Sequence, residues 1–267
     1  MDDFLSLPTL LQHSTWLKEA CAMMQQTAWV KVAIQARRDN KHNEVHDING
    51  LKIAQYSQQG QEIDIIKNFM PKIDEVRDGT FVELGGYNGI TYSNTKGIED
   101  TFGFKGVLVE ASHAFVAMDI NRPNTQNFRA AISKEPLVTF CGSGPCAGTL
   151  ENMEINTLHD ESLWRPDKEQ YTSPGRRMSD ILQESKLEYI DLFFIDVEGS
   201  ELDVINTMDW SIPMYLICIE MHSMKSRKKE QTQIRKILKK QGFTFKKKIE
   251  DDEVWVNDSY FRKDKFV

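Results

Sequence analysis

Apolar runs alternate with amphipathic segments over most of the chain, as in α/β proteins. Strands are predicted at 80–84, 106–110, 127–132, 190–196 and 214–219, where bulky apolar residues follow one another. Helical spacing of apolar positions marks 63–73, 178–187, 202–208 and 226–241, and two closing antiparallel strands are predicted at 243–248 and 253–262. This order predicts an α/β fold with a Rossmann-like, doubly wound sheet and antiparallel C-terminal strands.

The N-terminal part of the chain lacks this alternation. Residues 1–37 carry apolar positions at helical spacing and residues 38–50 are polar, so we expect a helix followed by a loop. The chain is therefore divided into an N-terminal helical extension, 1–55, and one domain over 56–267. We expect the extension to cap the site, to form a homodimer surface, or both.

A second region without clear periodicity lies in the middle of the chain. Residues 137–150 are predicted to form a hairpin that turns at 142–145. Residues 151–176 are polar and irregular. We expect this insertion to be a lid that faces the substrate, and a plain surface loop is the alternative.

The first predicted strand ends in a glycine-rich turn that contains Glu83, Gly85, Gly86, Tyr87 and Gly89. Glycine permits positive φ and lets a ligand approach the backbone, so the turn is expected to bind a small ligand. A helix is expected directly after it, with its N-terminus directed at the same place. The dinucleotide fingerprint G-x-G-x-x-G does not fit, because bulky residues stand where two of its glycines belong.

Two further motifs follow predicted strands. The strand at 106–110 ends at Glu110, where an acid can accept hydrogen bonds from ribose hydroxyls, and Ser112 is expected to cap the next helix. The strand at 190–196 leads into Ile-Asp-x-Glu-Gly-x-Glu. With the glycine turn, these motifs closely resemble the FkbM family of S-adenosylmethionine (SAM) dependent methyltransferases, from Tyr56 to near Tyr260.

The resemblance implies an enzyme, a SAM-dependent O-methyltransferase. Its acceptor would be a hydroxyl of a sugar, a glycan or a polyketide-like small molecule. It also implies contacts to the three parts of the cofactor. The residues expected at the methionine part are Glu83, Gly85, Gly86, Tyr87 and Gly89, the residue at the ribose is Glu110, and those near the adenine are Ala111, Ser112 and Ala131.

Acids and one histidine fall at the carboxyl ends of the predicted strands, where open α/β sheets bind ligands. Asp196 is the first candidate for the base that a hydroxyl acceptor needs, and His222 is the second, with a structural histidine as its alternative. Glu198 is a further catalytic candidate, or else it caps the turn at Gly199 by binding backbone N–H groups. Asp196 and Glu220, with His222, are candidate ligands for Mg²⁺, although such a set does not identify a metal.

Charge adds one alternative function. The net charge of −7 carries no general nucleic-acid signature, yet 225–248 holds eleven Lys/Arg and one acid. The alternative is therefore a catalytically silent SAM-fold binding module that docks through 225–248, although a solvated helix face explains the same charges. A nucleic-acid partner is not expected, because the N-P-P-Y motif of base-amine methylation is absent. Without an evident secretory signal or membrane span, a cytoplasmic location is expected.

Overall fold

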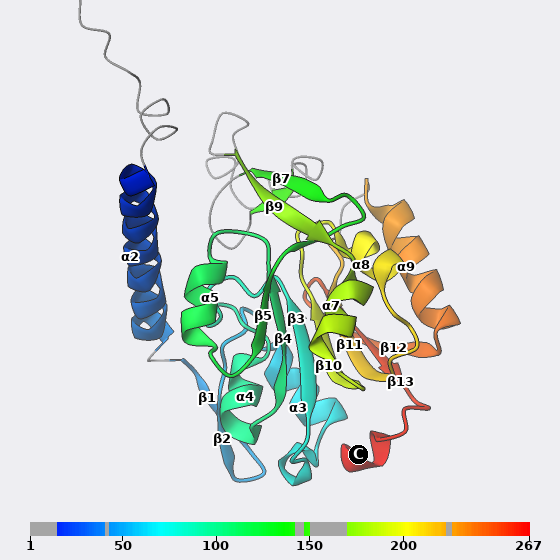
Figure 1. Cartoon of the computed structure of the whole chain (residues 1–267). Coiled ribbons are helices and arrows are strands. Elements are labelled where there is room, and N and C mark those ends of the chain that lie inside the picture. The colour runs from blue at the N-terminus through cyan, green and yellow to red at the C-terminus, as the bar shows by residue number, and fades with distance from the viewer. Residues whose placement is uncertain (1–14, 41–42, 142–146, 150–169, 223–225) are drawn as a thin grey trace, which may run out of the picture.

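A twisted central sheet organises the computed structural model, which describes residues 15–40, 43–141, 147–149, 170–222 and 226–267 (Figure 1). Within these residues the sheet has seven strands in the order β12–β13–β11–β10–β3–β4–β5. The strands are β3 (Thr80–Leu84), β4 (Lys105–Glu110), β5 (Gln126–Arg129), β10 (Ile190–Ile195), β11 (Met214–Glu220), β12 (Phe243–Ile249) and β13 (Asp252–Asn257). The first five are parallel, and β12 and β13 add an antiparallel edge, which confirms the predicted doubly wound α/β fold.

Helices cover both faces of this sheet. One face packs against α3 (Gln61–Phe69), α4 (Lys96–Phe102) and α5 (Phe115–Asn121), and the other against α7 (Met178–Ser185), α8 (Glu201–Thr207) and α9 (Lys228–Lys240). The two faces follow from alternation along β10. Leu192 and Phe194 point to the first core, while Phe193 and Ile195 point to the second. Because both faces are buried, the strand is a continuous apolar run in the sequence.

A smaller sheet lies above the carboxyl ends of the central strands (Figure 1). Its order is β6–β9–β7–β8, with β6 (Ala131–Ile132), β7 (Leu137–Cys141), β8 (Gly148–Thr149) and β9 (Gln170–Arg176). The predicted hairpin is present as β7 and β8, while its turn at 142–145 lies outside the described residues. The predicted strand at 127–132 is two strands, because the chain leaves the central sheet after Arg129 and joins the small one.

The insertion predicted at 151–176 is in part a regular strand. Its last residues form β9, which pairs with β7, and residues 150–169 lie outside the described residues. Pro174 lies opposite Leu137 in the last pair of the β7–β9 ladder. The expectation that the whole insertion lacks regular structure was therefore wrong for 170–176.

The N-terminal extension contains α2 (Thr15–Asp39) and a two-stranded hairpin, β1 (Val45–Ile48) with β2 (Leu51–Ala54). The loop predicted at 38–50 was thus wrong for 45–48. Asn49 and Gly50 form the turn with φ of 54° and 84°, as an Asn-Gly hairpin requires. The hairpin buries Ile48 and Ile53 against the main body.

Three further local predictions were wrong. No helix follows the glycine turn directly, and α4 begins only at Lys96. The helix α5 begins at Phe115, and Ser112 precedes its cap instead of forming it. The last strand, predicted to run from 253 to 262, ends at Asn257, after which Tyr260 turns into the core and short 3₁₀ turns follow at Lys263–Lys265. Another 3₁₀ turn, Ile73–Glu75, follows α3.

Candidate cofactor and active site

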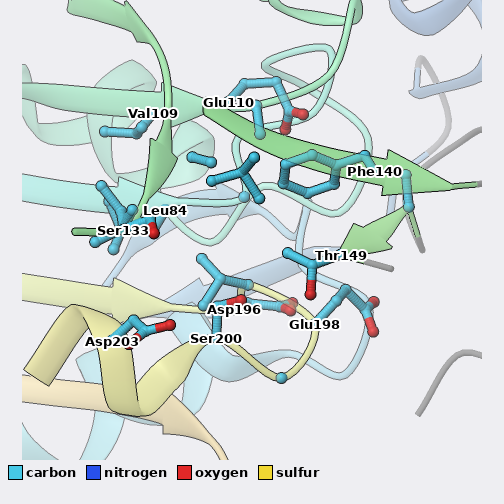
Figure 2. A pocket seen from close by; sticks show the side chains of 18 of the residues that line it. Leu84, Val109, Glu110, Ser133, Phe140, Thr149, Asp196, Glu198, Ser200 and Asp203 are labelled. Atoms are coloured by element: carbon cyan, nitrogen blue, oxygen red, sulfur yellow. The ribbon is translucent and has the colours of Figure 1, made fainter. Parts of the chain in front are cut away.

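A cavity of about 740 Å³ opens between the carboxyl ends of the central strands and the small sheet. This volume lies in the range of cofactor and drug-sized ligand sites. Figure 2 shows Glu110 and Phe140 on one side of it, with Asp196 and Glu198 on the opposite side. The lining residues that the sequence predicted are Gly85, Tyr87, Glu110, Ala111, Ala131, Asp196, Glu198 and Glu220.

The glycine turn reaches the cavity through Gly85 and Tyr87. The amides of Gly85 and Gly86 both donate to the Val109 carbonyl, each at 3.0 Å, so the turn folds over the end of β4. Gly85 has φ of +81°, and a Cβ built on it would lie 2.0 Å from the backbone oxygen of Asp196. Only glycine fits this close approach of two strand ends. Gly85 also lines the cavity.

Positive φ explains why no helix starts at the turn. Tyr87, Gly89 and Tyr92 have φ of 44°, 81° and 62°, and an α-helix cannot continue through such positions. Glu83 holds the resulting loop from below. Its carboxylate is 2% exposed and accepts hydrogen bonds from the Ser93 hydroxyl at 2.9 Å, from the Asn94 amide at 2.7 Å and from the Thr95 hydroxyl.

Glu83 is therefore a residue that shapes the loop, and it is not among the residues that line the cavity. The same is true of Gly86, Gly89 and Ser112. Gly86 faces Met118, where an added Cβ would lie 2.6 Å from the sulfur, and Gly89 packs against Arg122. These glycines permit close packing under the turn, while Gly85 and Tyr87 form its open side.

Glu110 stands at the end of β4 and joins two loops. One carboxylate oxygen accepts from the Tyr87 amide at 2.7 Å, and the other accepts from the Ser112 amide at 2.6 Å. The side chain is 8% exposed and borders the cavity. Each oxygen keeps a second lone pair, so the carboxylate can still accept from a vicinal diol.

Asp196 follows β10 and opens onto the cavity. Protein surrounds this part of the cavity, and that enclosure, followed by the negative charges of Glu220 and Glu198, raises the pKa of Asp196 well above its ordinary value. In its ionised form, a carboxylate with a raised pKa is a stronger base than an ordinary aspartate.

His222 lies behind the cavity wall, between two glutamates. Its Nε2 is 3.0 Å from Glu220 Oε2 and 3.8 Å from Glu198 Oε2. Burial alone would lower the pKa of His222, but the two carboxylates outweigh it and raise this pKa to about 10. The imidazole is thus protonated at neutral pH and cannot accept a proton, so the geometry favours Asp196 over His222 as a base.

The same three side chains place possible metal-ligating atoms together. One oxygen each of Glu198 and Glu220 and one ring nitrogen of His222 lie within 4.8 Å of one another. The predicted set, Asp196 and Glu220 with His222, differs from this one in having Asp196 in place of Glu198. Glu198 has φ of +50°, which turns its side chain back toward the end of β11.

Sequence reasoning missed the wall that the small sheet supplies. Phe140 and Thr149 line the cavity from β7 and β8, and both are visible in Figure 2. Phe140 stacks on Tyr171 of β9, with ring centroids 5.5 Å apart. Arg227, just before α9, also lines the cavity. The predicted hairpin at 137–150 and the lid expected at 151–176 hinted at this wall, but no motif marks its residues.

None of the helices in the described part of the chain is both long enough and apolar enough to cross a membrane.

Solved structures with similar folds are methyltransferases or related proteins at low sequence identity. The Methanococcus jannaschii fibrillarin, a pre-rRNA processing protein, is 12% identical, covers 82% of this chain and 84% of its own, and has a TM-score of 0.44. Aeropyrum pernix fibrillarin, solved with natively bound S-adenosyl-L-methionine, is 12% identical over 81% and 82% of the two chains, with a TM-score of 0.42.

A human methyltransferase 10 domain containing protein is 10% identical over 87% of this chain and 94% of its own, with a TM-score of 0.42. At these sequence identities and TM-scores, the substrates of the similar proteins do not indicate the substrate of this chain. Comparison with curated proteins finds no match.

The family assignment comes from a sequence model. The model described as the methyltransferase FkbM domain matches residues 83–245, which is more than half of the chain. The matched region begins at Glu83 and contains the glycine turn, Glu110 and Asp196, the residues around which the cavity is built. The chain belongs to the FkbM family of SAM-dependent methyltransferases.

Proposed function

We propose that the protein transfers a methyl group from SAM to a hydroxyl of a neutral small molecule, such as a sugar, a glycan or a polyketide-like compound. The observation that supports this most is the position of Asp196. It is a carboxylate with a raised pKa that opens onto the cavity, at the carboxyl edge of the sheet and opposite Glu110 (Figure 2). An acceptor hydroxyl must lose a proton, and Asp196 is placed to accept it.

The residues present fit SAM. Gly85 lines the cavity, Glu110 offers acceptors to the ribose hydroxyls, and Tyr87 borders the same space. Ala111 and Ala131 line the cavity beside Glu110, where an adenine would lie. When bound, SAM supplies an activated methyl group on a sulfonium. We assign Glu83, Gly86, Gly89 and Ser112 to the support of this cradle.

The chain itself has two tasks in the reaction. It must hold the acceptor in line with the methyl group, because orientation alone can contribute about 7–11 kcal/mol. It must also accept the hydroxyl proton, and we assign this step to the carboxylate of Asp196. His222, protonated between Glu198 and Glu220, keeps these two side chains in place behind Asp196.

Calorimetric titration with SAM tests the cofactor assignment. We expect Glu110→Gln to weaken SAM binding about tenfold or more. Glutamine keeps one acceptor oxygen and has an NH₂ group, which only donates, in place of the other. Glu135→Gln is the matched control, since Glu135 also lines the cavity but lies outside the cradle. A wild-type protein that fails to bind SAM would overturn the proposal.

Turnover tests the role of Asp196. In a screen of hydroxyl acceptors, Asp196→Asn should lower kcat by about a hundredfold or more and leave SAM affinity near that of the wild type. Loss of SAM binding with unchanged kcat would instead make Asp196 a cofactor ligand.

A divalent cation such as Mg²⁺ is the second part of the proposal. Glu198 and Glu220 would hold it, together with His222 once the cation has displaced the proton from its imidazole, and its chemistry would be to acidify the acceptor hydroxyl. Titration of the metal-free protein with Mg²⁺ and Mn²⁺ should show binding that Glu198→Gln abolishes and Glu135→Gln preserves. Turnover that is equal with a chelator present and absent would remove the cation from the mechanism.

The alternative function is a catalytically silent binding module that docks through 225–248. Within the described residues, several of its cations already pair with carboxylates, as Arg235 does with Glu253 and Lys247 with Asp64. The joint replacement of Lys228, Lys229, Lys239 and Lys240 should leave SAM binding and turnover unchanged. A cytoplasmic location and a homodimer through the extension stay predictions from the sequence.

A further inference from the structure

The N-terminal helix α2 is linked to the cofactor loop, residues 85–92 beside the cavity, through Arg37, which lies outside the family match. The match begins at Glu83, and α2 ends at Asp39. Its last turns pack beside α5 (Figure 1). From there Arg37 reaches the end of α5, where its Nε donates to Asn121 Oδ1 at 2.7 Å and its Nη2 donates to the Ile120 carbonyl at 2.9 Å.

Asn121 connects Arg37 to the cofactor loop. Its Nδ2 donates to the Asn88 carbonyl at 2.8 Å, and both asparagines are buried. An amide side chain has one end that accepts and one end that donates, whereas a guanidinium only donates. Arg37 therefore obliges Asn121 to turn its oxygen outward, which directs its NH₂ group at Asn88.

Asn88 fixes the curve of the cofactor loop. Its Oδ1 accepts from the amides of Ile90 at 3.0 Å and Thr91 at 2.8 Å, and its Nδ2 donates to the Thr91 hydroxyl at 3.0 Å. A further side chain at the end of α2, that of Asn40, donates to the same hydroxyl at 3.4 Å. Tyr87 and Thr91, on either side of these bonds, line the cavity.

The loop needs such support because it is strained. Tyr87 adopts φ of 44°, and the glycines at 85 and 89 both have φ of 81°. A bulky residue in the left-handed region is strained, and neighbouring contacts must offset this strain. Glu110 holds the loop at the Tyr87 amide, and Asn121 holds it at the next residue.

We propose that Arg37 and Asn121 are positioning residues for the cofactor, and that α2 is therefore a working part of the SAM site. The chain of contacts Arg37–Asn121–Asn88 holds the loop in its binding conformation. This inference rests on the proposed SAM site. It adds that a segment outside the family domain sets the affinity of that site, without contact between α2 and the cofactor.

Variants of the full chain test it by SAM titration and by hydrogen exchange of the amides at 87–91. Arg37→Ala should raise the Kd for SAM about three- to tenfold and speed this exchange, as expected for the loss of one or two hydrogen bonds. Arg37→Lys should recover part of the affinity, because an ammonium can replace one donor. Arg38→Ala, an exposed neighbour on the same helix, is the control and should change neither quantity.

Asn121→Asp separates this role from simple docking of α2. A carboxylate pairs with Arg37 at least as well as an amide does, but it cannot donate to the Asn88 carbonyl. We expect α2 to stay protected from exchange while SAM affinity falls at least as far as in Arg37→Ala. Wild-type affinity in Asn121→Asp, or in Arg37→Ala with faster exchange confined to α2, would overturn the proposal.

The failure of the proposed function gives a different result. A wild-type chain without SAM affinity would overturn the function, whereas exchange at 87–91 would still report on the contacts. Unchanged exchange at these amides in both Arg37→Ala and Asn121→Asp would show that the chain of contacts does not hold the loop.

Discussion

Glu201, in the first turn of α8, is a buried side chain whose pKa depends on a neighbouring carboxylate. It is 8% exposed, and burial followed by the charge of Glu220 raises its pKa to about 7, although its Oε1 accepts from the Gly199 amide at 2.9 Å. As the pH rises, the unfolded chain releases the Glu201 proton near its pKa of 4.5. The folded protein keeps this proton until about pH 7. Ionised Glu201 reduces stability, and this cost is absent below about pH 4.5 and complete above about pH 7.

Replacing Glu201 by glutamine tests this sign. The amide oxygen can keep the bond from Gly199 without a charge, so Glu201→Gln should gain up to about 3 kcal/mol of unfolding free energy at pH 8 and little near pH 5. Chemical denaturation of the metal-free protein at both pH values measures the difference. Glu188→Gln, at an exposed site, should show no such pH dependence. A constant gain at both pH values would contradict the assignment.

At the scale of elements, the junction between β3 and β10 depends on one glycine far more than on the next. The missing Cβ of Gly85 faces a backbone oxygen of Asp196, which cannot move without bending β10, and its φ is positive. The missing Cβ of Gly86 faces the sulfur of Met118, at the end of a flexible side chain. Backbone leaves no room for adjustment, whereas a methionine can change its rotamer.

We therefore expect Gly85→Ala to cost about 1–3 kcal/mol or more of stability and to abolish measurable SAM binding. Gly86→Ala should cost less and retain binding, because Met118 can rotate away. Thermal unfolding and SAM titration of the two variants give the comparison. Equal losses in both would show that crowding under the turn, and not the approach to Asp196, explains the glycines.

At the scale of the whole molecule, the cavity is strongly acidic. Among the described residues that line it, seven carry a carboxylate and one, Arg227, carries a guanidinium, which already pairs with Glu230. The lysines and the arginine of α9 itself do not line the cavity. Such a cavity attracts a cationic cofactor and disfavours a negatively charged acceptor, because like charges in an enclosed site cost several kcal/mol.

For any neutral acceptor that the enzyme methylates, its phosphate monoester should therefore have a kcat/KM at least about tenfold lower. Higher salt should reduce the difference between the two kcat/KM values, since it screens the repulsion between the cavity and the phosphate. The double variant Glu135→Gln with Glu230→Gln should reduce this difference in kcat/KM further. A phosphorylated acceptor that reacts faster than its neutral parent would contradict the electrostatic argument.

The sequence by itself determined the order of strands and helices and the edge that carries the site. Continuous apolar runs such as 190–195 are needed wherever both faces of a strand are buried, so the sheet is visible in the pattern. Acids that follow these runs must meet at one edge, and Glu110 and Asp196 both line the cavity there. An overlooked local signal, Asn49–Gly50, also marked the N-terminal hairpin.

Only the tertiary structure decided what each side chain does at that edge. Glu83 and Glu110 both end a strand, yet Glu83 turns under the loop to Ser93 and Asn94 while Glu110 borders the cavity. The loop conformation depends on contacts with Asn121, far away in the sequence, and Arg37 reaches the same point from α2. Local pattern records which residues are buried, whereas the partners of a buried polar group are set by elements that meet only in the folded chain.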